Sequence, residues 1–388
     1  KNNFFSCKDK NHILAEIFYV VANALSSQNI YSLSNYYLNI NQCKSFGTIE
    51  LICDLQNPED FAKIPHEDSL VVSQFAGLPE LNEGRVLTGK LSKLNLDSRK
   101  VEDFEIEILE NNNLGIGQDD CKPFKNLYPH GIDIFDNFSA DAKNASPFLE
   151  EASLLAVVNH QEISSVEFFL VFPEFVNFSD RSKPTLIWVG CVSAPKKNTY
   201  FNDVVVYDSK GSFFATHQYD KDKRFLDLLV INFFRFNSGY VYQWNYKNDF
   251  SIVPNSGGAW PNGIEMIGED LYVNYRINGM ISKFSGGKRK DFILRTYLKG
   301  GPDNVIAVGN NLWIAGQNTD LGAIHCINEA VIQCPMPFFV IKTDESLNIL
   351  KEYNFEDVSY GGASVAYPFK DEVFIGAYKS DRIGIFKR

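Results

Sequence analysis

The sequence contains no run of about 18 apolar residues, so it predicts no membrane-spanning helix. Basic residues are outnumbered, with 37 Lys and Arg against 48 Asp and Glu, and the formal net charge is −11. Because nucleic-acid binders present clustered Lys and Arg, this balance argues against a nucleic-acid partner. Long polar tracts are also lacking. With 45% hydrophobic and 22% charged residues, the composition is that of a globular protein.

Cysteine is sparse and scattered, which excludes a zinc-binding spacing. The count is odd, so at least one thiol has no partner within the chain; the seven residues are Cys7, Cys43, Cys53, Cys121, Cys191, Cys326 and Cys334. Three sequons predict N-glycosylation at Asn137 (NFS), Asn144 (NAS) and Asn177 (NFS). A first residue of Lys1 is compatible with removal of a signal peptide. We therefore expect a secreted protein or one of the secretory-pathway lumen.

From Gly47 onward the sequence consists of short segments rich in Val, Ile, Phe and Tyr, separated by turn residues, which predicts an all-β fold. One unit recurs: a polar residue, an alternating strand, a turn and a second strand, as in PNGIEMIGEDLYVNY. Six such units open near Glu59, His130, Asn202, Asn262, Asp303 and Ser364. Six units predict a six-bladed β-propeller over residues 47–388, since a four-stranded blade needs about 40 residues.

Residues 1–46 are expected to form a short, helical N-terminal extension outside the propeller. Its apolar segment, Ile13–Leu25, is too short to cross a membrane. This segment either packs on the propeller or makes peripheral contact with a lipid or membrane surface.

The first strand of each propeller blade lines the central tunnel, so the opening residues of the units should converge on one axis. The oxygen- and nitrogen-bearing side chains at these openings are Glu59, Asp60, His130, Asn202, Asp203, Asn262, Asp303 and Asn304. Carboxylates and amides are the ligands that calcium prefers. Neighbouring strand residues point in opposite directions, which predicts two calcium ions. Any one Asn or Asp is explained equally well by turn formation, but recurrence in successive units favours a metal site.

Two of the six histidines lie where strands begin or end, His130 in YPHGI and His160 in VVNHQ. Taken singly, each is explained by a buried, hydrogen-bonded position in the core. Together with PHGIDIF, LLAVVNHQEISSVEFF, FND, PNGI, PDNV and the Glu59–Asp60 pair, they make the chain resemble the paraoxonase/arylesterase family. The resemblance covers most of residues 47–388 and implies a calcium-dependent hydrolase of lactones or aryl esters.

The resemblance also implies roles for individual residues. A catalytic calcium would be held by Glu59, Asn202, Asn262, Asp303 and Asn304. A structural calcium would be held by Asp60, Asp203 and the main-chain carbonyl of Ile132. Calcium would polarise the substrate carbonyl, and His130, supported by His160, would activate a water molecule as general base.

The sequence departs from the family pattern at two places. Its last strand, DRIGIFKR, has no cysteine for the family's closing disulfide, so strand pairing should close the ring, with a local bridge between Cys326 and Cys334. Gln317 also follows a WIAG-like strand where the family has a cysteine nearby, which affects the substrate pocket. Two other functions stay open: a non-catalytic, calcium-stabilised binding or chaperone-like propeller, and a gluconolactonase-like sugar lactonase.

Overall fold

The computed structural model describes residues 43–45, 47–77, 88–108, 114–136, 152–173, 183–223, 225–295, 300–318, 336–356 and 360–388. A compact unit runs from Ser45 to Arg388. Several expectations lie outside the described residues: the apolar segment Ile13–Leu25, the glycosylation sites Asn137, Asn144 and Asn177, and the bridge between Cys326 and Cys334.

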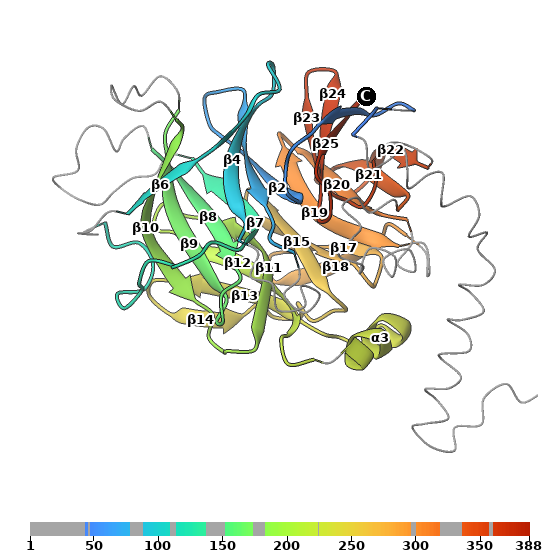
Figure 1. The fold of residues 1–388 in the computed structure, drawn as a ribbon. Coiled ribbons are helices and arrows are strands. Elements are labelled where there is room, and N and C mark those ends of the chain that lie inside the picture. Colours follow the sequence, from blue (N-terminus) through green and yellow to red (C-terminus); the bar gives the residue numbers. More distant parts are fainter. Residues whose placement is uncertain are drawn as a thin grey trace, which may run out of the picture. The chain divides into compact units, whose positions relative to one another are not determined.

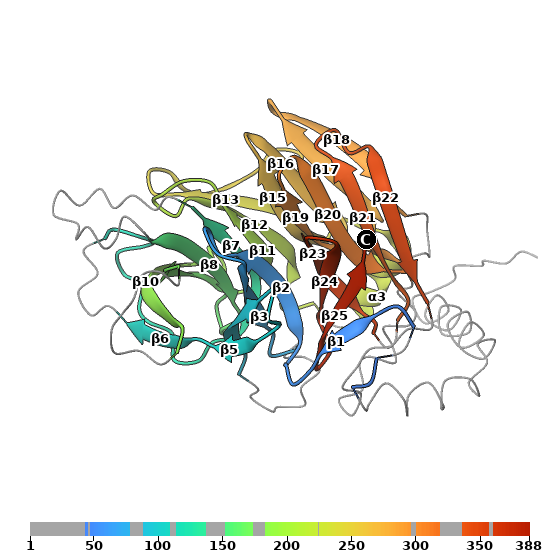
Figure 2. The same cartoon turned by 90° about the horizontal axis from the view of Figure 1, so that it is seen from above.

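Six sheets surround a common centre (Figures 1 and 2). In each sheet the strands follow the chain from the inside outward, except for two short strands that precede their sheets in the chain and lie at the outer edges. The first blade contains β2 (Pro58–Lys63), β3 (Ser69–Gln74), β4 (Lys90–Asn95) and β5 (Val101–Asp103). The second contains β7 (Pro129–Phe135), β8 (Ser153–Asn159), β9 (Ser165–Val171) and β10 (Thr185–Ser193), with β6 (Glu105–Ile108) parallel to β10 at its edge. The third contains β11 (Thr199–Val206), β12 (Phe213–Asp220), β13 (Tyr240–Asn245) and β14 (Asp249–Ile252).

The fourth blade contains β15 (Pro261–Ile267), β16 (Asp270–Tyr275), β17 (Met280–Ser285) and β18 (Lys288–Ile293). The fifth contains β19 (Gly301–Val308), β20 (Asn311–Gln317), β21 (Phe338–Asp344) and β22 (Ile349–Phe355). The sixth contains β23 (Ala363–Phe369), β24 (Glu372–Ala377), β25 (Ile383–Lys387) and β1 (Glu50–Ile52). The predicted all-β, six-bladed propeller is therefore confirmed, and each predicted unit opens at an innermost strand.

Strand pairing closes the ring in the sixth blade. The first strand, β1, pairs antiparallel with the last strand, β25, from Glu50 opposite Ile385 to Ile52 opposite Ile383. The expected closure by strand pairing between the ends of the propeller is confirmed. The two described chain segments at this seam are held by backbone hydrogen bonds and by burial of Ile383 and Ile385.

Inner strands are buried on both faces, whereas outer strands expose one face. Every residue of β8 (SLLAVVN) and β9 (SVEFFLV) is buried, but β18 and β22 are largely exposed. Neighbouring blades pack face to face through aromatic side chains, for example Phe168 of β9 against Phe213 of β12 at 6.2 Å between ring centroids. Each such buried side chain contributes about 1.5–3 kcal/mol to stability. This packing fixes the inner strands that carry the site.

One helix, α3 (Phe225–Phe234), separates β12 from β13 and was not predicted from the sequence. Its sequence, FLDLLVINFF, is a short apolar run, and periodicity alone does not separate such a run from a buried strand. Phe234 of the helix and Phe236 just beyond it are exposed and stack on each other. Among the described residues, no helix is long and apolar enough to cross a membrane.

Candidate functional site

Each of the six innermost strands carries a break in register where its unit opens. The break falls between Pro58 and Asp60 in β2, for example, and between Pro302 and Val305 in β19. Such bulges re-aim side chains and are common beside functional sites. Innermost strands of neighbouring blades are in contact all around the ring. The bulges therefore bring the polar residues of different blades together at the tunnel.

The glycines of PHGI and PNGI allow this close approach. A Cβ atom at Gly131 would lie 2.3 Å from Oδ1 of Asp203, and one at Gly263 would lie 2.5 Å from Cα of Asn304. Neither position has room for a side chain. In these two units the glycine after the opening residue lets the inner strand of the next blade approach within van der Waals distance.

The residues proposed for the catalytic calcium share an unusual property. Four of them are almost fully buried, at 1–3% exposure, and each has a side-chain oxygen with no hydrogen-bond partner: Glu59 Oε2, Asn202 Oδ1, Asn262 Oδ1 and Asn304 Oδ1. An unpaired buried acceptor costs about 1–3 kcal/mol. Carboxylate and amide oxygens are the ligands that calcium prefers, so the chemistry of this donor set fits calcium.

Glu59 connects this set to the histidines. Asn304 donates its Nδ2–H to Glu59 Oε1 at 2.9 Å, which leaves Asn304 Oδ1 as the unpaired atom. On the other side, His130 Nε2 lies 3.6 Å from Glu59 Oε1. Burial, together with the nearby Asp60, Asp303 and Asp203, raises the pKa of Glu59 well above its ordinary value. A positive charge at this position would relieve that repulsion.

Asp303 differs from the other four residues. Its Oδ2 lies 3.2 Å from Nη1 of Arg276 and accepts a hydrogen bond from Gln317 Nε2 at 2.8 Å. Both partners are buried, at 8% and 0% exposure. No sequence pattern singled out Arg276, which simply follows the β16 strand, and Gln317 was noted only as a departure from the family.

The residues proposed for the structural calcium bond to main-chain N–H groups. Asp60 accepts from Phe61 N at 2.9 Å and, across to the second blade, from Ile132 N at 2.8 Å. Asp203 accepts from Val204 N and, across to the fourth blade, from Ile264 N, both at 2.8 Å. The structure thus shows the N–H of Ile132, rather than its carbonyl, facing the carboxylate of Asp60.

Two further acids that the sequence interpretation missed repeat this arrangement. Asp133 accepts from Ile134 N in its own strand and from Val206 N of the third blade at 2.7 Å. Glu265 accepts from Met266 N at 2.7 Å and from Ala307 N of the fifth blade at 2.8 Å. We call Asp60, Asp133, Asp203 and Glu265 the inter-blade carboxylates, because each joins its own inner strand to the next one.

Burial is the main cause of raised pKa values in this group: Asp60 rises to about 7, Asp133 to about 6 and Glu265 to about 8, while Asp203 rises well above its ordinary value. Repulsion from neighbouring carboxylates adds to the effect at Asp60, Asp203 and Glu265. No three Asp, Glu, His or Cys side chains gather in metal-binding geometry within the described ranges. A cation here would therefore need main-chain or amide oxygens as well as carboxylates.

The two candidate catalytic histidines form a pair. His130 Nδ1 lies 2.7 Å from His160 Nε2, and both rings are buried. Phe75 stacks on His130 at 4.4 Å and Tyr200 stacks on His160 at 4.2 Å between ring centroids. Burial lowers the pKa of His130 to about 3 and that of His160 well below its ordinary value. Both imidazoles are therefore neutral at physiological pH and each keeps an acceptor nitrogen.

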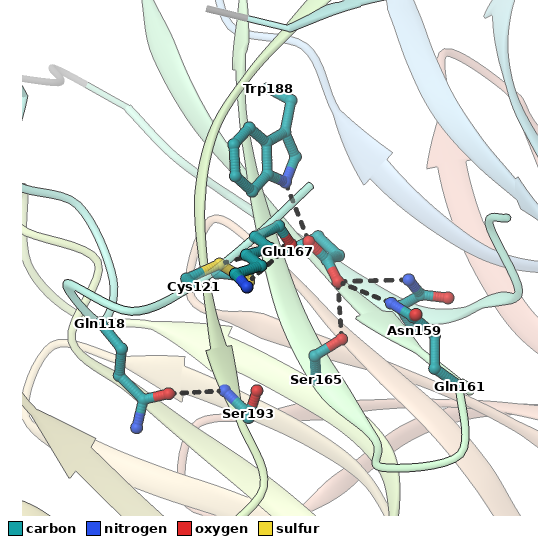
Figure 3. Close-up of a disulfide and its surroundings, with 10 residues drawn as sticks. Gln118, Cys121, Asn159, Gln161, Ser165, Glu167, Trp188 and Ser193 are labelled. Carbon is teal, nitrogen blue, oxygen red and sulfur yellow. Dashed lines mark hydrogen bonds between the residues drawn. A yellow bond between two sulfur atoms is a disulfide. The ribbon is translucent and has the colours of Figure 1, made fainter. Parts of the chain in front are cut away.

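Glu167 is a buried carboxylate whose hydrogen bonds are shown in Figure 3, and one of its partners, Asn159, contacts the segment just before β7. Glu167 Oε1 accepts from Ser165 Oγ at 2.6 Å and Asn159 Nδ2 at 3.2 Å, and its Oε2 accepts from Trp188 Nε1 at 2.9 Å. Asn159 in turn accepts from Tyr128 N at 2.8 Å, and His160 N donates to the carbonyl of Tyr128 at 3.0 Å. Glu167 therefore orders the segments that precede His130 and His160.

Replacement of Glu167 by Ala should lower the free energy of unfolding by about 2–5 kcal/mol, because several buried donors lose their acceptor. Gln should cost less, since it keeps one acceptor oxygen. Burial raises the pKa of Glu167 in the folded protein above its unfolded value. The stability linked to protonation of this group is therefore fully present below the unfolded pKa and is lost as the pH rises through the folded pKa. Urea unfolding of parent and Gln variant from pH 4 to 8 checks this, and identical pH slopes would contradict it.

A disulfide fastens the loop that leads to β7. Cys121 and Cys191 are bonded across 70 residues, with Cα atoms 5.6 Å apart, and Ser193 N donates to Gln118 Oε1 at 2.9 Å beside the bond (Figure 3). Cys43 and Cys53 are also disulfide-bonded. Their connectivity was not predicted, since a bridge across 70 residues leaves no spacing pattern.

No protein-family model and no curated protein matches the chain. Solved structures share its propeller fold. A gluconolactonase-like protein is 10% identical with a TM-score of 0.46, covering 89% of this chain and 94% of its own. Virginiamycin B lyase from Staphylococcus aureus is 12% identical with a TM-score of 0.44, covering 88% of this chain and 99% of its own. At these values the likeness concerns the fold alone.

Proposed function

We propose that this chain is a calcium-dependent hydrolase of lactones or aryl esters, a carboxylic ester hydrolase. The observation that carries the proposal is the set of unpaired, buried oxygens on Glu59, Asn202, Asn262 and Asn304, next to the pair of neutral histidines. The first feature suits a hard cation. The second supplies a proton acceptor beside it.

The catalytic calcium would be held by Glu59, Asn202, Asn262, Asp303 and Asn304. A second, structural ion would be held by Asp60, Asp203 and the carbonyl of Ile132. When bound, calcium supplies Lewis-acid polarisation of the substrate carbonyl.

The histidines handle the proton in this proposal. The mechanism uses the tautomer in which His130 Nδ1–H donates to His160 Nε2, 2.7 Å away, so that His130 Nε2 accepts a proton from the attacking water. The rings of Phe75 and Tyr200 stack on the pair, keep its orientation and exclude bulk water from its faces. Because both imidazoles start neutral, the acceptor nitrogen is available without prior loss of a proton.

Chelation tests the proposal. We expect that EGTA abolishes hydrolysis of a panel of aliphatic lactones, sugar lactones and aryl esters, and that added calcium restores it. Calcium at about 100 times its Kd should also stabilise the fold by about 2.7 kcal/mol, by mass action. Magnesium is the control, since it suits this many protein oxygens poorly. Hydrolysis that persists in EGTA would contradict the proposal.

One observation favours a second candidate, a calcium-stabilised propeller that binds a partner without catalysis. Burial lowers the pKa of His130 to about 3, far below the range near neutral pH that suits a general base. Stabilisation by calcium with no hydrolysis of any substrate in the panel would support this candidate.

We also propose a secreted or secretory-lumen location. The disulfide between Cys121 and Cys191, and the disulfide-bonded Cys43 and Cys53, are typical of an oxidising compartment. Glycosylation at Asn137, Asn144 and Asn177 would accompany that location.

A further inference from the structure

Arg276 is a buried arginine with a fixed position at the edge of the candidate site. It directly follows β16, and only 9% of its side chain is exposed. Its N–H donates to the carbonyl of Trp260 at 3.0 Å, and its own carbonyl accepts from Gly279 N at 3.1 Å. A Cβ atom at Gly301 would lie 1.8 Å from the Arg276 carbonyl oxygen, so the backbone of the fifth blade packs directly against it.

Two buried side chains, of Arg276 and Gln317, contact one carboxylate oxygen of a third, Asp303. Arg276 Nη1 and Gln317 Nε2 both contact Asp303 Oδ2, at 3.2 and 2.8 Å. Arg276 Nη1 also donates to Gln317 Oε1, which closes a triangle of contacts. The main chain of Asp303 is held separately, because Asn274 Nδ2 donates to its carbonyl at 2.7 Å. The carboxylate is therefore presented to the guanidinium by a rigid frame.

This triangle changes the charge of the candidate calcium site. The proposed ligands contain two carboxylates, Glu59 and Asp303, and the guanidinium compensates one of them. The other four ligands offer unpaired oxygens, whereas Asp303 offers an oxygen that a cation already holds. A fixed positive charge repels a second cation at short range, and burial strengthens the repulsion.

We propose that Arg276 is an internal cation that stabilises Asp303 in the metal-free ring and thereby sets a low calcium affinity for the tunnel site. The inference rests on the proposed function, because it concerns the same calcium site. In the metal-free ring, Arg276 keeps Asp303 from being a buried, uncompensated charge. In the calcium-bound ring, the same guanidinium weakens binding. Arg276 therefore lowers the affinity for calcium and raises the stability of the calcium-free protein.

The test is calcium binding to the full chain by isothermal titration calorimetry, after EGTA treatment and at constant ionic strength. We expect Arg276→Leu to lower the Kd for calcium at least about tenfold, since a like charge is removed from the site. Its melting temperature without calcium should fall, and calcium should restore it. Arg276→Gln keeps a hydrogen-bond donor for Asp303, so it should also lower the Kd for calcium but lose less stability. Arg276→Lys keeps the charge and should bind calcium as the parent does.

Arg289→Leu is the matched control. Arg289 lies in the same blade and its guanidinium pairs with Asp291 at 2.6 Å, away from the proposed ligands. Its replacement removes the same charge and should leave the Kd unchanged. If the folded Leu and Gln variants both bind calcium no more tightly than the parent, the inference is overturned. If the parent itself binds no calcium, or if Asn262→Ala leaves binding unchanged, the proposed site fails and the inference fails with it.

Discussion

Replacing His130 by Gln is expected to lower the rate of lactone hydrolysis by about 100-fold to 10,000-fold, the usual contribution of a positioned general base. Gln cannot accept and relay the proton of the attacking water through the contact with His160, which is 2.7 Å in the parent. Calcium binding should be nearly unchanged, because His130 is not among the proposed ligands. The measurements are kcat on the best substrate of the panel and the calcium Kd of both proteins.

The matched control is His217→Gln. His217 is also a buried histidine, at 2% exposure, but it contacts Tyr200 N and Asp220 rather than the pair. Its replacement should cost stability with little change in kcat. If His130→Gln keeps most of the parent's rate with its fold and calcium intact, His130 only lines the tunnel, and polarisation by the metal is the whole mechanism.

Replacing Asp60 by Ala is expected to lower the free energy of unfolding by about 2–5 kcal/mol, because two buried main-chain N–H groups, of Phe61 and Ile132, lose their acceptor. If Asp60 also holds the structural calcium, the variant should lose part of the stabilisation that calcium gives the parent. Asn304→Ala should instead abolish hydrolysis with a modest loss of stability. Urea unfolding with and without calcium measures the first effect.

Asp133→Ala provides the comparison for Asp60. Asp133 makes the equivalent pair of main-chain contacts, to Ile134 and Val206, but is not a proposed ligand. Both variants should lose a similar amount of stability in EGTA, and only the Asp60 variant should respond less to calcium. An equal response to calcium in both variants would show that Asp60 joins the blades and does not bind the metal.

The fold was readable from the sequence because a propeller repeats one local pattern. In each unit a polar residue marks the start of the inner strand. The structure places Glu59, Asn202, Asn262 and Asn304 at equivalent bulges. The bulges themselves were not predicted, since one extra residue in a strand leaves no mark in an alternating pattern. They matter because neighbouring residues in these strands do not simply alternate between two faces.

The missed residues fall into two groups. Asp133 and Glu265 follow their opening residues by three positions, and Asp60 and Asp203 follow theirs by one, but the bulges at these openings break the simple alternation. The signal for Asp133 and Glu265 was the acid that directly follows Gly-Ile in both PHGID and PNGIE. Arg276 and Glu167 act through partners far along the chain, Asp303 for the one and Trp188 for the other. Such contacts depend on how blades pack, which a single sequence does not display.

The seam between β1 and β25 has a consequence for the order in which the protein is made. The partner of Glu50–Ile52 is Ile383–Ile385, which is among the last parts of this sequence to leave the ribosome. Until then β24 is the outermost strand of the sixth blade and β1 has no partner, so both present open edges. The first five blades can form during synthesis, but the ring cannot shut before β25 has emerged. The nascent chain therefore carries the unpaired edge of β1 until β25 emerges, which is when a chaperone would be of use to it.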